Sequence, residues 1–176
     1  MTAIRMIARP MLASVFFVGG LNALRNAESL APKAAPVTDR IVPAAQKAAP
    51  TAPIPEDTTT LVRVNAVVQL VGAAALATGR FPRLSSTVLA ASLVPTTIAG
   101  HPFWAESDPA AARAQRLQFV KNVSTLGGLL LAGVDTEGRP GVAWRARRAA
   151  KDVRREAKHL GHDVQNAARL AAAKAT

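Results

Sequence analysis

Cysteine and tyrosine are absent from this chain, and aromatic residues make up only 4% of its 176 positions. Without cysteine, the protein can form no disulfide, no thiol relay and no thiolate metal site. Histidine is almost as scarce, with three residues, so we expect no histidine-rich metal site. Thiol-based redox chemistry is therefore excluded for the chain itself.

Acidic residues are also few: 11 Asp and Glu stand against 22 Lys and Arg, for a formal net charge of +11. Yet 49% of the residues are apolar, which is unusual in so basic a soluble protein. The mean hydropathy is only +0.16, as expected if apolar helices and basic flanks are separate regions whose hydropathies cancel in the average. Strong basicity ordinarily suggests nucleic acid, but positive charge beside apolar segments favours anionic lipid headgroups. We expect no nucleic-acid partner.

Long apolar segments are what the chain does contain. Four of them could cross a bilayer as helices: residues 4–24, 61–79, 84–100 and 117–134. The third has about 17 residues, the lower limit for a span, and its Pro95 frees the carbonyl of Ala91. A signal peptide is the alternative for the first, but Leu24-Arg25-Asn26 stands where a cleavage site would need small residues. We predict an all-α fold, with a transmembrane four-helix bundle over residues 1–141.

The connections differ in composition. Residues 26–56 hold six prolines, at positions 32, 36, 43, 50, 53 and 55. Because proline interrupts helices, we expect a loop on the bilayer surface here; the alternative is a short helical piece around 38–48. Gly79–Arg83 is predicted to form a tight turn, because Pro82 disfavours helix for the residue before it.

Residues 142–176 are predicted to form an amphipathic basic helix. Its apolar stripe is narrow and mostly alanine, and Trp144 suits a membrane interface. We expect this tail to rest on anionic headgroups, and a docking surface for a soluble protein is the alternative. If there are four spans, fourteen Lys and Arg lie on the side of both termini and seven on the other. That bias places both termini in the cytoplasm.

Polar residues within the spans collect in one half of the predicted bundle. When spans one and three run outward and two and four inward, five residues share the outward half: Asn22, Asn65, Gln69, Lys121 and Asn122. Lys121 then lies on the order of 6 Å, and Gln69 about 12 Å, inside the outer boundary. His101 and Trp104 belong to the connection that would cover this half. The inward half is Gly, Ala, Leu and Val.

Two interpretations of these residues remain open. In the first, the amides and hydroxyls form interhelical hydrogen bonds, while Lys121 reaches the headgroups or pairs with Glu106 or Asp108. In the second, they line a small pocket for an amphipathic ligand such as a quinone, whose carbonyls need donors. A transporter would need a continuous polar path, which the apolar inward half argues against.

Five stretches carry a recognisable pattern. They are Phe16-Phe17-Val18-Gly19-Gly20-Leu21-Asn22-Ala23-Leu24, the Gly79-Arg80 turn, His101-Pro102-Phe103-Trp104, Phe119-Val120-Lys121-Asn122 and Leu126-Gly127-Gly128-Leu129-Leu130. In these, over about residues 4–141, the chain resembles the DoxX family of four-helix bacterial membrane proteins. The Pro/Ala-rich connection and the ending Asp135-Thr136-Glu137-Gly138-Arg139-Pro140-Gly141 resemble actinobacterial members.

The resemblance implies a role beside redox enzymes. Some relatives belong to thiosulfate:quinone oxidoreductases, and others are linked to membrane-associated oxidative-stress complexes. Many relatives have a glutamate where this chain has Gln69. Because an amide does not titrate, any proton-handling role of that glutamate does not transfer to this chain. The resemblance thus implies an accessory or quinone-side subunit in the cell inner (plasma) membrane, with quinone as the candidate cofactor. The alternative is a non-catalytic scaffold that recruits soluble partners through its basic tail.

Overall fold

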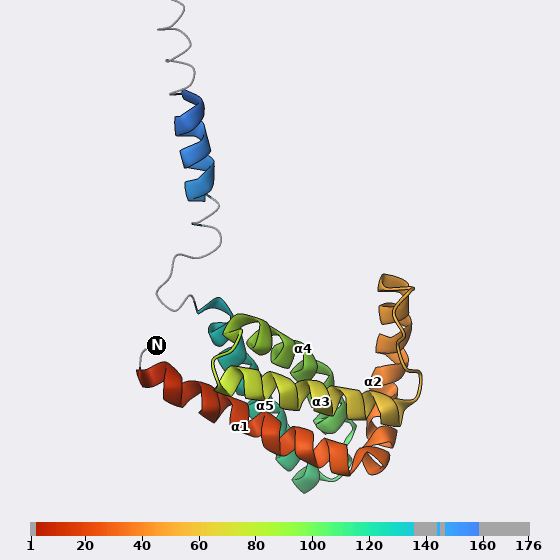
Figure 1. Ribbon diagram of the computed structural model, residues 1–176. Coiled ribbons are helices and arrows are strands. Elements are labelled where there is room, and N and C mark those ends of the chain that lie inside the picture. Colours follow the sequence, from red (N-terminus) through yellow and green to blue (C-terminus); the bar gives the residue numbers. More distant parts are fainter. Residues whose placement is uncertain (1–2, 136–143, 145–146, 159–176) are drawn as a thin grey trace, which may run out of the picture. The chain divides into compact units, whose positions relative to one another are not determined.

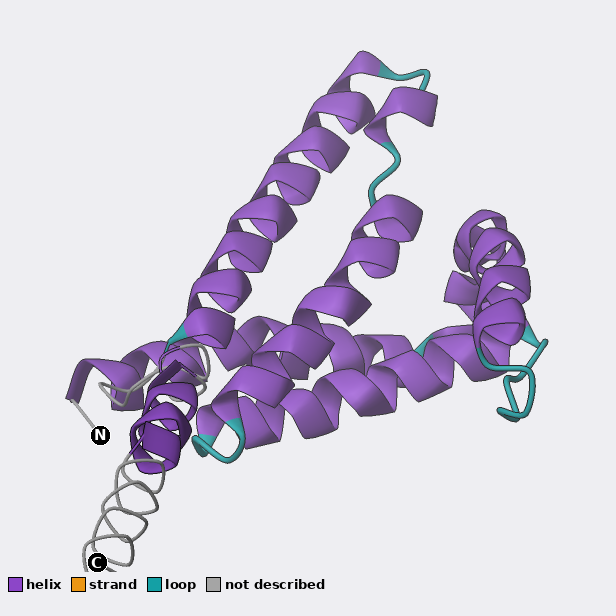
Figure 2. Cartoon of the chain, turned by 90° about the horizontal axis from the view of Figure 1, so that it is seen from above, coloured by secondary structure: helices purple, strands orange, loops and turns teal. Residues whose placement is uncertain are grey.

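The computed structural model describes residues 3–135, 144 and 147–158, and this part of the chain contains helices and loops without strands (Figures 1 and 2). The chain divides into two compact units, Met1–Asp135 and Thr136–Thr176. The first unit contains five α-helices and one 3₁₀ helix. These are α1 Ala3–Arg25, α2 Ala27–Ala48, α3 Thr58–Ala77, α4 Pro82–Gly100, η1 Phe103–Ala105 and α5 Pro109–Val134.

An aspartate side chain caps the N-terminus of α3 and of α5. The carboxylate of Asp57 accepts a hydrogen bond from the Thr60 backbone N–H at 2.7 Å and so caps α3. Asp108 caps α5 in the same way, accepting from Ala111 N–H at 2.9 Å. Such caps satisfy backbone donors that have no partner within the helix.

The predicted tight turn between α3 and α4 is present. Gly79 has φ 70° and Phe81 has φ 50°, the left-handed backbone region that reverses a chain within few residues. Pro82 then opens α4, where a missing N–H costs nothing. The turn makes α3 and α4 antiparallel neighbours.

The buried apolar core is built from α1, α3, α4 and α5. Its members are Ala13, Phe16, Ala73, Leu76, Leu89, Ala90, Leu93 and Leu129. Two glycines allow close helix packing: a Cβ on Gly20 would lie 3.2 Å from the Ala66 backbone carbonyl oxygen, and one on Gly72 would lie 3.0 Å from the Leu89 side chain. Close contact through small residues is how helices associate in lipid, where apolar burial alone gives no driving force.

A charged cluster closes the end of the unit nearest this core. Asp135 receives two hydrogen bonds from the Arg5 guanidinium, at 2.7 and 2.9 Å, and Arg9 lies 3.9 Å from the same carboxylate. Arg83 donates to the Asp135 backbone carbonyl at 3.0 Å. We call these four residues the Asp135 clamp. They join the start of α1, the start of α4 and the end of α5.

The expectation of a loop over residues 26–56 is wrong for most of that range, because α2 is a continuous helix from Ala27 to Ala48. Its internal prolines, Pro32, Pro36 and Pro43, lie on one face at near-helical spacing, and all three are exposed. The rings and the carbonyls they leave free therefore face outward, while the opposite face packs on α3 and α4. In Figure 1, α2 stands at a steep angle to α1 and α3.

By length and composition, three described helices qualify as membrane spans: α1, α3 and α5. The fourth predicted span is a helix, α4, but it does not meet the hydropathy of the others because it holds Arg83, three serines and three threonines. The structure therefore shows an all-helical chain in its described part with three candidate spans, and the transmembrane four-helix bundle stays a prediction. Most hydroxyls of α4 donate to backbone carbonyls of α4 or of the turn before it, as from Thr97 to Leu93 O at 2.7 Å, whereas Ser92 donates to Asn65 on α3.

In the second unit, residues 147–158 are helical. The remainder of the predicted tail helix over 142–176, apart from Trp144, lies outside the described residues. An amphipathic basic helix over that whole range stays a prediction.

Candidate functional site

Two of the predicted site residues, Asn65 and Gln69, lie together on α3 and bind hydroxyls of α4. Gln69 is buried, and its Nε2 donates to Ser92 Oγ at 2.9 Å and to Thr96 Oγ1 at 3.2 Å. The Asn65 amide nitrogen donates to Thr96 Oγ1 at 3.2 Å, and its carbonyl oxygen accepts from Ser92 Oγ at 2.7 Å. We call these four residues the amide–hydroxyl network.

This network satisfies most of its own hydrogen-bonding capacity. Gln69 Nε2 uses both hydrogens, the Ser92 hydroxyl donates to Asn65, and the Thr96 hydroxyl donates to the Ser92 carbonyl at 2.8 Å. Among the described residues, no buried side-chain nitrogen or oxygen lacks a partner. No member titrates, so the network joins two helices and cannot store a proton.

Asn122 binds α4 at a separate point. Its Nδ2 donates to Thr97 Oγ1 at 3.1 Å, and Thr97 is buried. Because Thr96 and Thr97 are adjacent, α3 and α5 both bond to the same turn of α4. Asn65, Gln69 and Asn122 therefore all bond to α4 between Ser92 and Thr97, while their role as a ligand site stays a prediction.

His101 and Trp104 lie at the end of α4 and in η1. His101 Nδ1 lies 2.7 Å from Gln115 Oε1, and since that oxygen only accepts, the ring N–H donates. Trp104, Phe103 and Phe119 form an edge-to-face trio, with centroids 5.1, 5.4 and 6.0 Å apart. These contacts fix η1 on the start of α5, and Trp104 remains 58% exposed.

Lys121 and Asn22 are placed differently from the rest. Lys121 is exposed on α5, and among the described residues its ammonium forms no hydrogen bond or ion pair; the predicted pairing with Glu106 or Asp108 is not formed. Asn22 is exposed near the end of α1, where its Oδ1 accepts from Asn26 Nδ2 at 2.9 Å. That bond links α1 to the start of α2, so Asn22 does not join the network.

Several functional-site candidates were missed by sequence reasoning. Ser92, Thr96, Thr97 and Gln115 supply the partners of predicted residues, yet isolated hydroxyls in an apolar helix attract little notice. The spacing of Ser92 and Thr96, four residues apart, was a usable signal because it puts both on one helix face. Nothing in the sequence pairs Arg5 with Asp135, which lie 130 positions apart.

A hollow of about 730 Å³ is lined by Trp144 and by six residues of the 147–158 helix, none of them a predicted site residue. A hollow of about 280 Å³ lies beside α2, lined by Thr38, Asp39, Val42, Pro43, Gln46 and Glu56, and none of the predicted site residues lines it. Within the described ranges, no three His, Asp or Glu side chains are grouped to hold a metal ion. Among the predicted site residues, the Lys121 ammonium is exposed, and Asn122 uses one amide N–H on Thr97, so its second N–H forms no hydrogen bond with the described residues.

In a comparison with known families, the family model described as DoxX matches residues 4–102, a range that covers α1 to α4 except for Ala3. No curated protein and no solved structure matched the chain.

Proposed function

The chain belongs to the DoxX family, and from that premise we propose that it is an accessory, quinone-side subunit of a membrane redox or oxidative-stress complex. It would sit in the plasma membrane with four crossings and both termini in the cytoplasm. The observation that carries the ligand part of this proposal is Lys121, a cation within a candidate span with no ionic partner among the described residues. An ionisable residue so placed is a functional candidate by default.

Four crossings are supported by the Asp135 clamp. The bidentate bond between Arg5 and Asp135 brings the start of α1 and the end of α5 to the same end of the unit. If both helices span the bilayer, the chain must cross an even number of times, and α4 supplies the fourth crossing. Much of α4 is buried by protein, so it needs less apolar surface than a lipid-facing helix.

The orientation is supported by the distribution of positive charge. Arg5, Arg9 and Arg83 lie at the clamp end, which continues into the arginine-rich tail. Positively charged connections stay in the cytoplasm. The amide–hydroxyl network then faces the opposite, non-cytoplasmic half.

An accessory role fits the chemistry better than a catalytic one. The chain has no thiol to carry a sulfur intermediate, and the amide–hydroxyl network has no titratable member. Gln69 spends both amide hydrogens on α4, so it holds helices together and is not offered to a ligand. Electron and proton transfer would belong to a partner subunit.

Lys121 supplies what a quinone carbonyl requires. Its ammonium carries three donors on a flexible stem. Ser124 follows three residues and Gly127 six residues further along α5, and both are exposed. A Cβ on Gly127 would meet nothing within 4 Å, so a flat ring can lie against the helix here. A quinone would reach this face sideways from the lipid, which requires no enclosed cavity.

The test is quinone binding to full-length protein in lipid nanodiscs. A short-chain quinone is titrated while the emission of Trp104 is followed, in a Trp144→Phe background that leaves one tryptophan. We expect Lys121→Ala to weaken binding about tenfold or more, the loss of one charged hydrogen bond. Lys47→Ala, an exposed lysine on α2, is the matched control and should leave binding unchanged. Equal affinity in the two variants would overturn the quinone proposal.

The scaffold alternative is favoured by one observation, the separation of Thr136–Thr176 as a unit of its own. If this unit recruits soluble proteins, a chain ending at Gly141 will lose the partners that purify with the full-length protein. If every partner is retained, recruitment through the tail is ruled out.

A further inference from the structure

The helix at residues 147–158 divides its circumference into three sectors. At 100° per residue, its six cations fall within an arc of about 120°: Arg147, Arg148, Lys151, Arg154, Arg155 and Lys158. The two carboxylates, Asp152 and Glu156, follow in the next sector, and Ala149, Ala150, Val153 and Ala157 fill the third. The cations form one continuous face, which we call the cationic stripe.

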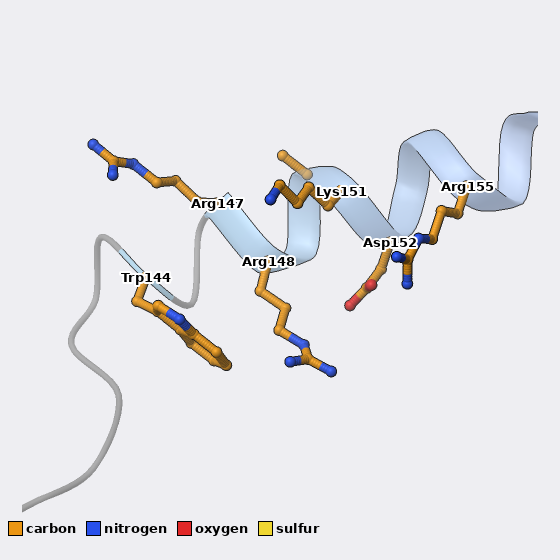
Figure 3. Close-up of a pocket in the computed structure, with 7 residues that line it drawn as sticks. Trp144, Arg147, Arg148, Lys151, Asp152 and Arg155 are labelled. Carbon is orange, nitrogen blue, oxygen red and sulfur yellow. The ribbon is translucent and has the colours of Figure 1, made fainter.

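These charges are directed outward. All twelve residues are exposed, and within the described part of this unit no ion pair joins a cation to either carboxylate. Trp144 is 51% exposed, and the Arg148 guanidinium lies 5.2 Å from the centre of its ring, within cation–π range. Figure 3 shows Trp144, Arg148 and Arg155 on one side of the helix.

We propose that the cationic stripe docks on the anionic phospholipid headgroups of the membrane that holds the first unit, with Trp144 entering the headgroup layer. Charge complementarity and chain continuity select this occupant. Only eleven residues separate the stripe from Asp135, one position beyond the candidate span α5. Eleven residues reach at most about 40 Å when fully extended, so the stripe is tethered within that distance of the end of α5.

The apolar sector explains why lipid charge is needed. Three alanines and one valine bury too little area to hold a helix in a neutral interface, so binding depends on the cations. Clusters of Lys and Arg beside a span bind anionic lipid in this way, with attraction that fades beyond the Debye length. Binding of the stripe therefore depends on the charge of the membrane surface and does not depend on quinone binding at Lys121.

The experiment uses the full chain with Trp104→Phe, so that Trp144 is the single fluorophore. In nanodiscs of phosphatidylcholine with about a third phosphatidylglycerol, we expect Trp144 emission to shift to shorter wavelength and to be quenched by brominated lipid. Pure phosphatidylcholine, or about 0.5 M salt, should reverse both signals.

Matched variants locate the effect. Changing Arg148, Lys151 and Arg155 to Gln should weaken docking roughly 100-fold, at about fivefold per cation. Removing three cations from α2 instead, with Lys33→Gln, Arg40→Gln and Lys47→Gln, should leave Trp144 unchanged. The paired change Asp152→Asn and Glu156→Gln should strengthen docking.

The proposal fails if Trp144 emission is the same in neutral and anionic nanodiscs. It also fails if the α2 triple variant abolishes the shift as fully as the stripe variant. A stripe that ignores lipid but binds an acidic protein would give the first of these results.

Discussion

The two halves of the first unit hold their helices together by different means. Near the Asp135 clamp, contacts are apolar and involve Leu76, Leu89 and Leu129, all fully buried. Toward His101, the same helices are joined by amides and hydroxyls around Ser92, Thr96 and Thr97. Packing requires matching shapes, whereas hydrogen bonds require matched donors and acceptors.

This difference explains how a helix as polar as α4 can pack between α3 and α5. The hydroxyls of Thr96 and Thr97 donate to the backbone of α4 and also accept amide N–H groups from α3 and α5. Ser92 instead donates to Asn65 on α3 and accepts from Gln69, so these three polar side chains bond to protein on both counts. Interhelical hydrogen bonds of this kind contribute modestly in membranes, about 0.6 to 2 kcal/mol each, so the apolar half should carry more of the stability.

Leu89→Ala should therefore show the largest effect. Leu89 fills the space beside Gly72, and the cavity left behind should lower the free energy of unfolding by about 2 to 3 kcal/mol. Detergent unfolding of the purified protein measures this. Leu131→Ala, at a position 72% exposed, is the control and should be nearly neutral. If both variants lose the same stability, the apolar half is not tightly packed.

Asp135→Asn should come next, with a loss of about 1 to 2 kcal/mol, because it leaves Arg5 and Arg9 facing a neutral amide in a site only partly open to solvent. Thermal unfolding at low and high salt gives the size. Arg63→Gln breaks an exposed pair with Glu28 and should cost less than about 0.5 kcal/mol. If Asp135→Asn loses as little stability as Arg63→Gln, the Asp135 clamp does not hold the helix ends together.

Gln69→Leu should lower stability by about 1 kcal/mol, since two hydrogen bonds to α4 are replaced by apolar contact. Its quinone affinity, by contrast, should match the unaltered protein. Gln118→Leu, an exposed glutamine on α5, is the control for the change in side-chain type. Loss of quinone binding with intact stability would move Gln69 from a structural to a ligand-binding role.

The smallest effect concerns Asp57, which lies before α3 and outside its span. Hydrogen bonds from the Thr60 hydroxyl and backbone N–H lower the pKa of this carboxyl below its usual 3.8. A lowered pKa means that the folded protein favours the carboxylate. Its contribution is then present above pH 4 and is lost as the pH falls through the lowered pKa. Asp57→Asn keeps a capping oxygen without charge, so the stability difference from the unaltered protein should shrink between pH 5 and pH 3. An unchanged difference would contradict this assignment.

Much of the helix content follows from the sequence alone, because long apolar runs bounded by Asp57, Asp108 and Pro82 allow few other structures. The collection of Asn65, Gln69 and Asn122 in one half also followed from counting residues along antiparallel helices. The α2 helix did not, because the number of prolines suggested a loop while their shared face allows a helix. The Asp135 clamp could not be found, since pairing across 130 positions depends on the tertiary fold. The sequence could not decide whether Lys121 is exposed or paired for a related reason: its exposure depends on how α5 is rotated about its axis against α4.

The most direct test of the account is whether α4 crosses the membrane. The absence of native cysteine means that single cysteines at Thr51, Thr78, Glu106 and Arg147, all exposed, each report one location. On intact cells, an impermeant maleimide should label the variants at Thr51 and Glu106, and should label those at Thr78 and Arg147 only after permeabilisation. Labelling of Thr78 and Glu106 from the same side would contradict four crossings and the placement of the polar half.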